Sequence, residues 1–320
     1  MEKHVIDTHA HYWPDAYLEH LKAAGSPDTD IAQGIGAGDS TEDMEKRLKM
    51  MDDAGVQYQL LSATPQAPQW GEANEALALA KEINDDYAAI IKAHPDRFLA
   101  YGAVPLPYVD EAIKEGKRAI EELGFLGIGV NTLIQNKWSI ADERFFPFFA
   151  AMDELGATIY IHPTGQGANS DLVNDYGLEW VVGAPIEDML VTLQLLKADI
   201  PNRFPHLKFH IAHLGGGISF QMQRIQDNYT DWNAFSSSPI DTLKEKFWFD
   251  AANFSTFALE NSAQIFGAER LLMGSDFPYF QNDKYTRAAT YITATNLTDE
   301  EKAGILRENV KTLHPHAKFD

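Results

Sequence analysis

The stretch Val5-Ile6-Asp7-Thr8-His9-Ala10-His11 lies close to the start of the chain and ends in two histidines one residue apart. Val5 and Ile6 are β-branched, which favours a buried strand. Because residues i and i+2 of a strand point to the same side, we expect His9 and His11 to present their imidazoles together at the strand's C-terminal end. Two neutral imidazoles suit a zinc-like divalent metal that takes one or two further ligands. Taken alone, the stretch is equally compatible with a histidine pair satisfied by hydrogen bonds.

The composition limits both the ligands and the partners. The chain has 320 residues and no Cys, so a metal site must use His, Asp or Glu. The formal net charge of −21 argues against nucleic acid and anionic membranes as partners. The sequence lacks a run of about 18 apolar residues, so we expect no membrane span. Met1-Glu2-Lys3 leads directly into the first strand, and we therefore expect no signal peptide and a cytoplasmic protein.

Strand-like and helix-like segments alternate along the whole chain. After the first strand, further strands are predicted at 56–63, 98–104, 127–133, 158–162, 208–213, 247–251 and 270–275. The intervening helices are predicted at 41–55, 72–94, 110–123, 145–155, 186–197, after Gly217, at 259–266 and from 298 to 309. Eight such units predict an α/β protein of the (β/α)8 TIM-barrel class, with residues 1–320 as one domain. A doubly wound open sheet is the alternative, but no Gly-rich dinucleotide fingerprint follows the first strand.

Ligand-type side chains fall at the ends of several predicted strands, the end at which such barrels place their active sites. They are His9 and His11 on strand one, His162 on strand five, His213 on strand six and Asp276 on strand eight. We expect the other strands to end in apolar or small residues. Each residue alone has a structural explanation, such as a hydrogen-bonded histidine, an Asx turn at Asp276 or a cap of the Gly-rich turn after His213. Together they predict a metal site.

These motifs resemble those of the amidohydrolase superfamily. Within it, the chain is similar to the amidohydrolase-2 branch typified by aminocarboxymuconate semialdehyde decarboxylase, nearly end to end. The similar segments include LGFLGIGVNT (123–132), WVVGAP (180–185) and LLMGSDFP (271–278). The resemblance implies that His9, His11, His162 and Asp276 bind one divalent metal and that His213 is an acid-base residue. Binuclear members carry a lysine at the end of strand four, where residues 127–131 read GIGVN, which agrees with a single metal. Three His and one Asp favour zinc, and manganese also fits.

Two reactions are compatible with these predicted site residues. In both, His213 and Asp276 are the candidate catalytic residues. The branch favours a non-oxidative decarboxylase of a small aromatic or unsaturated carboxylic acid. The alternative is a hydrolase or hydratase in which metal-bound hydroxide attacks a lactone or an amide. A metal-binding or ligand-binding barrel without turnover is the remaining class, and it would need a disabled site. The branch commonly forms homodimers, which we expect here by analogy.

Aromatic residues in the predicted rim loops favour a planar substrate. Trp13, Trp180 and Phe280 are candidate contacts, although each could equally belong to a loop core. The loop 28–43 contains no Arg or Lys, whereas the typifying decarboxylase grips a second carboxylate with an arginine there. A monocarboxylate such as a hydroxybenzoate is therefore favoured. Arg224 is the remaining candidate for binding an anion, with a surface ion pair as its alternative.

Two further residues carry structural predictions. Arg47 is expected on a solvated helix face with Lys46 and Lys49. His210 lies three residues before His213, so an extended strand is expected to turn it to the opposite face.

Overall fold

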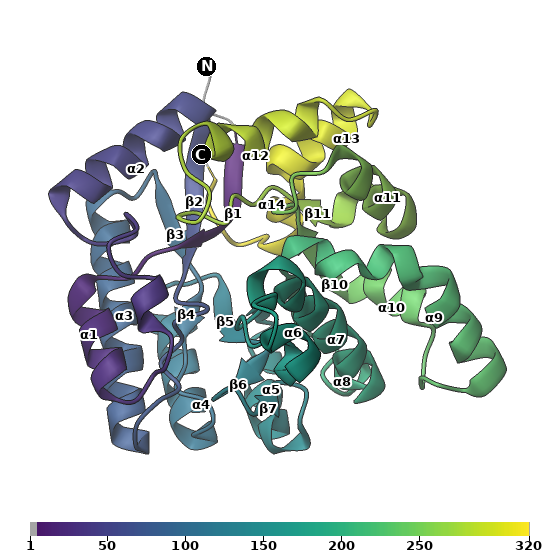
Figure 1. Cartoon of the computed structure of the whole chain (residues 1–320), viewed down its shortest axis with the longest axis horizontal. Helices are drawn as coiled ribbons and strands as arrows, with labels where there is room; N and C mark the ends of the chain where they lie inside the picture. The colour runs from purple at the N-terminus through teal and green to yellow at the C-terminus, as the bar shows by residue number, and fades with distance from the viewer. Residues whose placement is uncertain (1–4, 320) are drawn as a thin grey trace.

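A computed structural model describes residues 5–319; the outermost residues of the predicted domain, 1–4 and 320, lie outside the described residues. Its centre is a wall of parallel strands surrounded by helices (Figure 1). The wall strands are β1 (Val5–His11), β2 (Val56–Ser62), β3 (Phe98–Ala100), β4 (Gly102–Ala103), β5 (Gly127–Asn131), β8 (Thr158–His162), β9 (Lys208–Ile211), β10 (Phe247–Asp250) and β11 (Leu271–Leu272). Only Tyr101 separates β3 from β4, so these two occupy one position in the wall. A short hairpin, β6 (Leu133–Ile134) with β7 (Trp138–Ser139), follows β5.

Hydrogen bonds close this wall into a barrel. The strands pair in the orders β1-β2-β3 and β11-β10-β9-β8-β5-β4, and β3 runs directly into β4. On the other side, the Thr8 amide donates to the Met273 carbonyl at 2.9 Å and the His11 amide donates to the Phe277 carbonyl at 2.8 Å. These bonds join β1 to the segment after β11. The predicted (β/α)8 barrel is therefore confirmed, with all wall pairings parallel as its βα units require.

Helices cover the outside of the barrel. The longer ones are α1 (Asp15–Ala23), α2 (Thr41–Ala54), α3 (Ala73–Ala93), α4 (Val109–Lys117), α5 (Phe146–Asp153), α7 (Ala184–Lys197), α9 (Ile218–Trp232), α10 (Pro239–Lys246), α11 (Thr256–Phe266) and α12 (Asp283–Thr293). The shorter ones are α6 (Asp171–Asn174), α8 (Ile200–Arg203), α13 (Asp299–Ala303) and α14 (Asn309–Leu313). Tight or widened turns are η1 (Thr29–Ile31), η2 (Arg118–Glu122), η3 (Glu143–Phe145), η4 (Gly167–Asn169), η5 (Glu179–Gly183), η6 (His213–Gly217), η7 (Ala268–Arg270) and η8 (Gly304–Glu308). None of the helices within residues 5–319 is long and apolar enough to cross a membrane.

Local signals placed some helices well and missed others. The Ser40 hydroxyl accepts from the Asp43 amide at 3.1 Å, and Gly55 ends α2 with a φ of 71°, as the cap signals predict. The helices α1, α10 and α12 were not predicted. The sequence of α12, DKYTRAATYIT, is rich in β-branched and aromatic residues that lower helix propensity, and buried residues such as Tyr285 and Ile292 hold it in place.

The prediction for Arg47 is wrong. Its side chain is 1% exposed, and its guanidinium donates to the His11 carbonyl and lies 4.4 Å from the centre of the Phe277 ring. Helix α2 turns this residue inward because the end of β1 offers a carbonyl and aromatic faces that suit a planar cation. Arg47 therefore supports the backbone of the second histidine of the opening motif.

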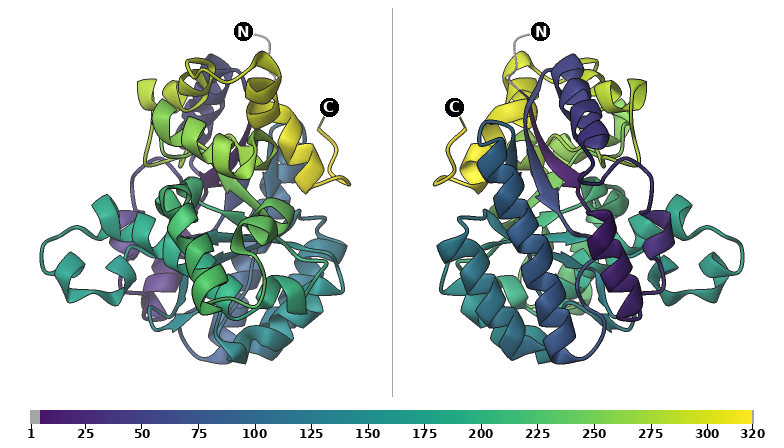
Figure 2. Two further views of the ribbon diagram at one scale, coloured as in Figure 1. Left: turned by 90° about the vertical axis from the view of Figure 1, so that its right-hand side faces the viewer. Right: turned by 90° about the vertical axis from the view of Figure 1, so that its left-hand side faces the viewer.

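One loop stands out from the compact barrel. The segment that holds α6 projects beyond the helices in both side views (Figure 2). Glu187, buried on α7, anchors its base by accepting from the Thr164 amide at 2.7 Å and the Gln166 amide at 2.8 Å. The loop therefore leaves and returns at the C-terminal end of β8, beside the strand ends that carry the candidate site.

Candidate metal centre and pocket

Four side chains from three parts of the barrel meet at the C-terminal strand ends. They are His9 and His11 of β1, His162 of β8 and Asp276 after β11, and one ligand atom of each lies within 4.8 Å of all the others. The Nε2 atoms of His9 and His11 are 3.2 Å apart, and each lies 3.3 Å from Asp276 Oδ1. All four residues are buried. The barrel brings together the same four residues that the sequence motifs singled out.

The surroundings turn the imidazoles toward one common point. In each of the three histidines, Nδ1 is held by a neighbouring group, which leaves Nε2 facing the cluster. The partners are Asp250 Oδ2 for His9 (3.0 Å), Ser62 Oγ for His11 (3.2 Å) and the Pro163 carbonyl for His162 (2.8 Å). The Nε2 atom of His162 is buried without a partner among the described residues. This donor set of three imidazole nitrogens and one carboxylate oxygen fits a divalent metal.

The electrostatics also favour a cation at this point. Burial disfavours charge on His9, yet the carboxylates of Asp250 and Asp276 raise its pKa to about 9. Burial lowers the pKa of His11 to about 4, and the positive charge of the neighbouring His9 lowers it further. Although burial opposes it, His9 and its neighbours hold the pKa of Asp276 well below its usual range. The two buried carboxylates thus require positive charge, and a divalent cation would supply it.

Asp250 is a functional residue that the sequence reasoning missed. We expected the strands other than one, five, six and eight to end in apolar or small residues, and this is wrong for β10, which ends in Asp250. Besides its bond to His9, Asp250 accepts from the His213 amide at 3.1 Å. It is 0% exposed, and His210 Nε2 at 3.3 Å and the Ala252 amide at 3.1 Å complete its polar contacts. A strand-end carboxylate in the sequence FWFDA was the available signal.

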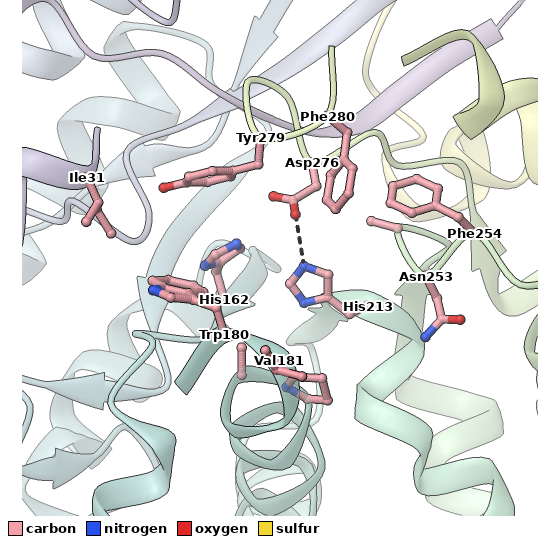
Figure 3. A pocket seen from close by; sticks show the side chains of 13 residues that line it. Ile31, His162, Trp180, Val181, His213, Asn253, Phe254, Asp276, Tyr279 and Phe280 are labelled. Atoms are coloured by element: carbon pink, nitrogen blue, oxygen red, sulfur yellow. Dashed lines mark ion pairs between the residues drawn. The ribbon is translucent and has the colours of Figure 1, made fainter. Parts of the chain in front are cut away.

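His213 lies beside the cluster and is positioned by a second carboxylate. Its Nδ1 lies 2.9 Å from Asp188 Oδ2 on α7, and its Nε2 lies 3.6 Å from Asp276 Oδ2, the ion pair drawn in Figure 3. Burial raises the pKa of Asp188 to about 7, although His213 opposes that rise. Although burial opposes it too, Asp188 raises the pKa of His213 well above its usual value. Asp188 lies within a predicted helix, and nothing in its local sequence marked it.

The backbone around His213 explains why one prediction failed. His213 has a φ of 51°, and residues 214–217 also have positive φ values. This left-handed turn ends the strand alternation, so His210 and His213 are not on opposite faces as expected. His210 instead points into the barrel interior, with its Nδ1 3.0 Å from the Tyr101 hydroxyl and its Nε2 3.3 Å from Asp250 Oδ2.

A pocket of about 470 Å³ opens onto the cluster. Among residues 5–319 its lining is largely apolar and includes no Lys or Arg. These residues are Ile31, His162, Trp180, Val181, Ala184, Pro185, His213, Ala252, Asn253, Phe254, Asp276, Tyr279 and Phe280. Phe254 and Phe280 pack edge to face on one side, with ring centres 4.7 Å apart, and Trp180 lies on another (Figure 3). Such walls suit a planar apolar ligand with its polar group directed at the cluster.

Two of the four candidate substrate contacts lie elsewhere. Trp13 stacks on His11 with ring centres 5.2 Å apart and donates its indole N–H to the Ala63 carbonyl at 2.8 Å. It is 1% exposed, so it supports the His11 ring from behind. Arg224 lies exposed on α9 and does not line the pocket. Trp180 and Phe280 do line it.

Comparisons with known proteins agree with this arrangement. The profile of the family described as Amidohydrolase matches residues 6–313, and the chain belongs to this family. It is 30% identical over 242 residues to the 2-amino-3-carboxymuconate-6-semialdehyde decarboxylase of Dictyostelium discoideum, covering 74% of this chain and 67% of that protein. It is 28% identical to the gamma-resorcylate decarboxylase of Rhizobium radiobacter, covering 84% of this chain and 86% of that protein.

A solved structure shares the fold over nearly the whole chain. The crystal structure of a dihydroxybenzoic acid decarboxylase from Polaromonas sp. JS666, with bound manganese and the inhibitor 2-nitroresorcinol, matches with a TM-score of 0.84. The identity is 23%, and the match covers 98% of this chain and 97% of that one. This likeness confirms the barrel fold.

Proposed function

We propose that this protein is a metal-dependent non-oxidative decarboxylase of an aromatic monocarboxylic acid of the hydroxybenzoate type. One observation carries the proposal: an apolar, aromatic-walled pocket, which has no Lys or Arg in its described lining, opens onto a buried cluster of three His and one Asp. A planar acid with a single carboxylate fits such a pocket, whereas a second carboxylate would lack a cationic partner in its walls. The named activities of the relatives support the same reaction class.

The proposed ligands of the metal are His9, His11, His162 and Asp276, and one divalent ion occupies the site. When bound, the metal would anchor the substrate's carboxylate or a neighbouring oxygen. We propose zinc on the strength of the nitrogen-rich donor set. Manganese is the competing ion, because the structurally similar dihydroxybenzoic acid decarboxylase contains it.

His213 and Asp276 are the proposed catalytic residues. In the reaction, the bond between the ring and the carboxylate breaks, the electron pair stays on the ring carbon, and a proton takes the place of the departing CO2. Asp188 accepts from Nδ1 of His213 and favours the imidazolium form, in which Nε2 carries the second proton on the side of Asp276. The two groups lie 3.6 Å apart as an ion pair, in which Asp276 stabilises the protonated His213 that would deliver this proton.

The assembly and setting are also proposals. Leu172, Tyr176 and Val181, on the projecting loop, are 82%, 76% and 73% exposed, and a homodimer would cover such apolar side chains. We further propose that residues 1–320 act as one domain. The lack of Cys and the acidic composition suit the cytoplasm.

Elemental analysis combined with CO2 release from a panel of hydroxybenzoates and unsaturated acids tests the proposal. One equivalent of zinc or manganese with CO2 release is the expected result, and chelation should abolish the release until metal is restored. If the protein binds metal but releases CO2 from none of the acids, the decarboxylase assignment fails and a hydrolase is favoured. Lactones and amides would then be tested. A protein that binds no metal after reconstitution would contradict the whole site.

A further inference from the structure

Tyr279 is a pocket residue whose role the proposed reaction does not yet explain. It follows Asp276 by three residues, and its ring centre lies 6.0 Å from that of His11 and 6.2 Å from those of Trp13 and Trp180. Aromatic rings therefore fix the Tyr279 ring beside the metal cluster. In Figure 3 its hydroxyl points away from Asp276, toward Ile31 across the pocket.

The hydroxyl of Tyr279 has no hydrogen-bond partner in the described part of the chain. Its oxygen is buried and makes no hydrogen bond with any residue in 5–319. A phenol is neutral at about pH 7, so this hydroxyl can donate a proton to a hydrogen bond. An unsatisfied buried hydroxyl is costly, and in a ligand pocket the ligand itself is the natural partner.

The other polar side chains of the pocket wall are less suited to bind the ligand through a hydrogen bond. Apart from the metal cluster and His213, the polar side chains that line the pocket are Asn253, Trp180 and Tyr279. Asn253 is exposed, and its amide points away from Asp276 (Figure 3). Trp180 belongs to the projecting loop and presents its ring face toward Tyr279 with a tilt of 30°. The buried hydrogen-bonding group in the wall is thus Tyr279.

We propose that Tyr279 recognises a second oxygen substituent on the substrate ring, so that the enzyme prefers dihydroxybenzoates to hydroxybenzoates that carry a methyl group at the same position. This inference rests on the proposed function. A hydroxyl and a methyl group are similar in size, so sterics alone do not separate the two substrates. A site built to bond a hydroxyl rejects the analogue that lacks it, because the protein's own polar group is then left unpaired.

The test compares matched pairs of salicylates that carry either a hydroxyl or a methyl group at position 3, 4, 5 or 6. For the metal-loaded wild type and Tyr279→Phe, both kcat/KM and calorimetric dissociation constants are measured. At one ring position we expect kcat/KM and affinity of the variant to fall by about 10- to 100-fold for the hydroxyl compound. Both values should change little for the matched methyl compound. Tyr229→Phe, which removes a hydroxyl on α9 outside the pocket, is the control and should change neither value.

The outcomes separate this inference from the proposed function. If the wild type releases CO2 and Tyr279→Phe affects hydroxyl and methyl compounds alike, or neither, then the inference is overturned and the decarboxylase assignment stands. If no acid releases CO2 but the variant selectively weakens binding of one hydroxyl compound, then Tyr279 is a ligand contact and the decarboxylase assignment fails. Absence of binding by every acid would overturn both. Equal metal content in wild type and variant shows that the cluster is intact.

Discussion

The imidazole Nδ1 of His9 lies 3.0 Å from Oδ2 of Asp250, and both side chains are fully buried. The carboxylate keeps Nε2 of His9 directed at the cluster and contributes negative charge beside it. Because Asp250 also accepts from the His213 amide at 3.1 Å, one carboxylate fixes a proposed metal ligand and the backbone of the proposed acid-base residue. The metal site and the proton donor are therefore mechanically linked through the end of β10.

Asp250→Asn should weaken metal binding by about 10- to 100-fold, the usual cost of losing the group that orients a ligating histidine. The amide keeps the shape but removes the charge and the reliable acceptor for His9. Chelator competition measures the change. Asp227→Asn, which alters an exposed carboxylate on α9, is the control and should retain wild-type affinity. An unchanged affinity in Asp250→Asn would show that Asp250 serves only the fold.

His213→Asn should retain the metal but lose about 10²- to 10⁴-fold in turnover, because the proton donor is removed while the four proposed ligands remain. Metal content and CO2 release are measured on the same sample. An empty site in this variant would reassign His213 as a ligand, and full activity would remove it from the mechanism.

Gly216→Ala should lower the free energy of unfolding by about 2–4 kcal/mol and reduce turnover with it. Gly216 has a φ of 61°, and a Cβ atom there would lie 1.7 Å from the Pro185 carbonyl oxygen at the start of α7. The clash pushes α7, and Asp188 with it, away from His213. Gly217→Ala is the matched control, since its φ is 89° but nothing lies within 4 Å of its Cβ position. Equal losses in thermal unfolding and turnover for both variants would assign the effect to φ alone.

Asp86→Asn should raise the melting temperature near neutral pH and lose this advantage in acid. Burial and the charges of Glu82, Asp39 and Asp85 raise the pKa of Asp86 from 3.8 to about 6. The folded state therefore binds this proton more tightly than the unfolded state, and the ionised carboxylate destabilises the fold above its folded pKa. As pH falls through about 6 toward 3.8 the destabilisation disappears, so the difference between variant and wild type should vanish there.

Calorimetric melting of both proteins from about pH 7.5 to about pH 4 gives that difference directly. Asp227→Asn is the control, because Asp227 is an exposed carboxylate on α9 that does not act on Asp86, and its loss should bring no gain. A gain in Asp86→Asn that does not depend on pH would refute the electrostatic explanation.

The sequence was sufficient to predict the barrel because the signals for its strands and helices are local. Strand and helix periodicities, the Ser40 cap and the Gly55 stop are carried by neighbouring residues, and eight alternating units leave few topologies. The sequence also predicted which side chains meet at the strand ends, namely His9, His11, His162 and Asp276, because parallel strands bring their C-terminal ends to one rim. The barrel then placed these side chains within 4.8 Å of one another.

Only the tertiary structure decided how the site is supported. Asp188 lies on α7 and Asp250 at the end of β10. Both contact His213, which is 25 residues from Asp188 and 37 residues from Asp250 in the sequence. The buried position of Arg47 and the left-handed turn at His213 likewise depend on packing between segments. So does the hydroxyl of Tyr279, which has no hydrogen-bond partner within residues 5–319. Sequence periodicity records which face of an element is apolar, whereas charge pairing and unsatisfied polar groups arise only when distant faces meet.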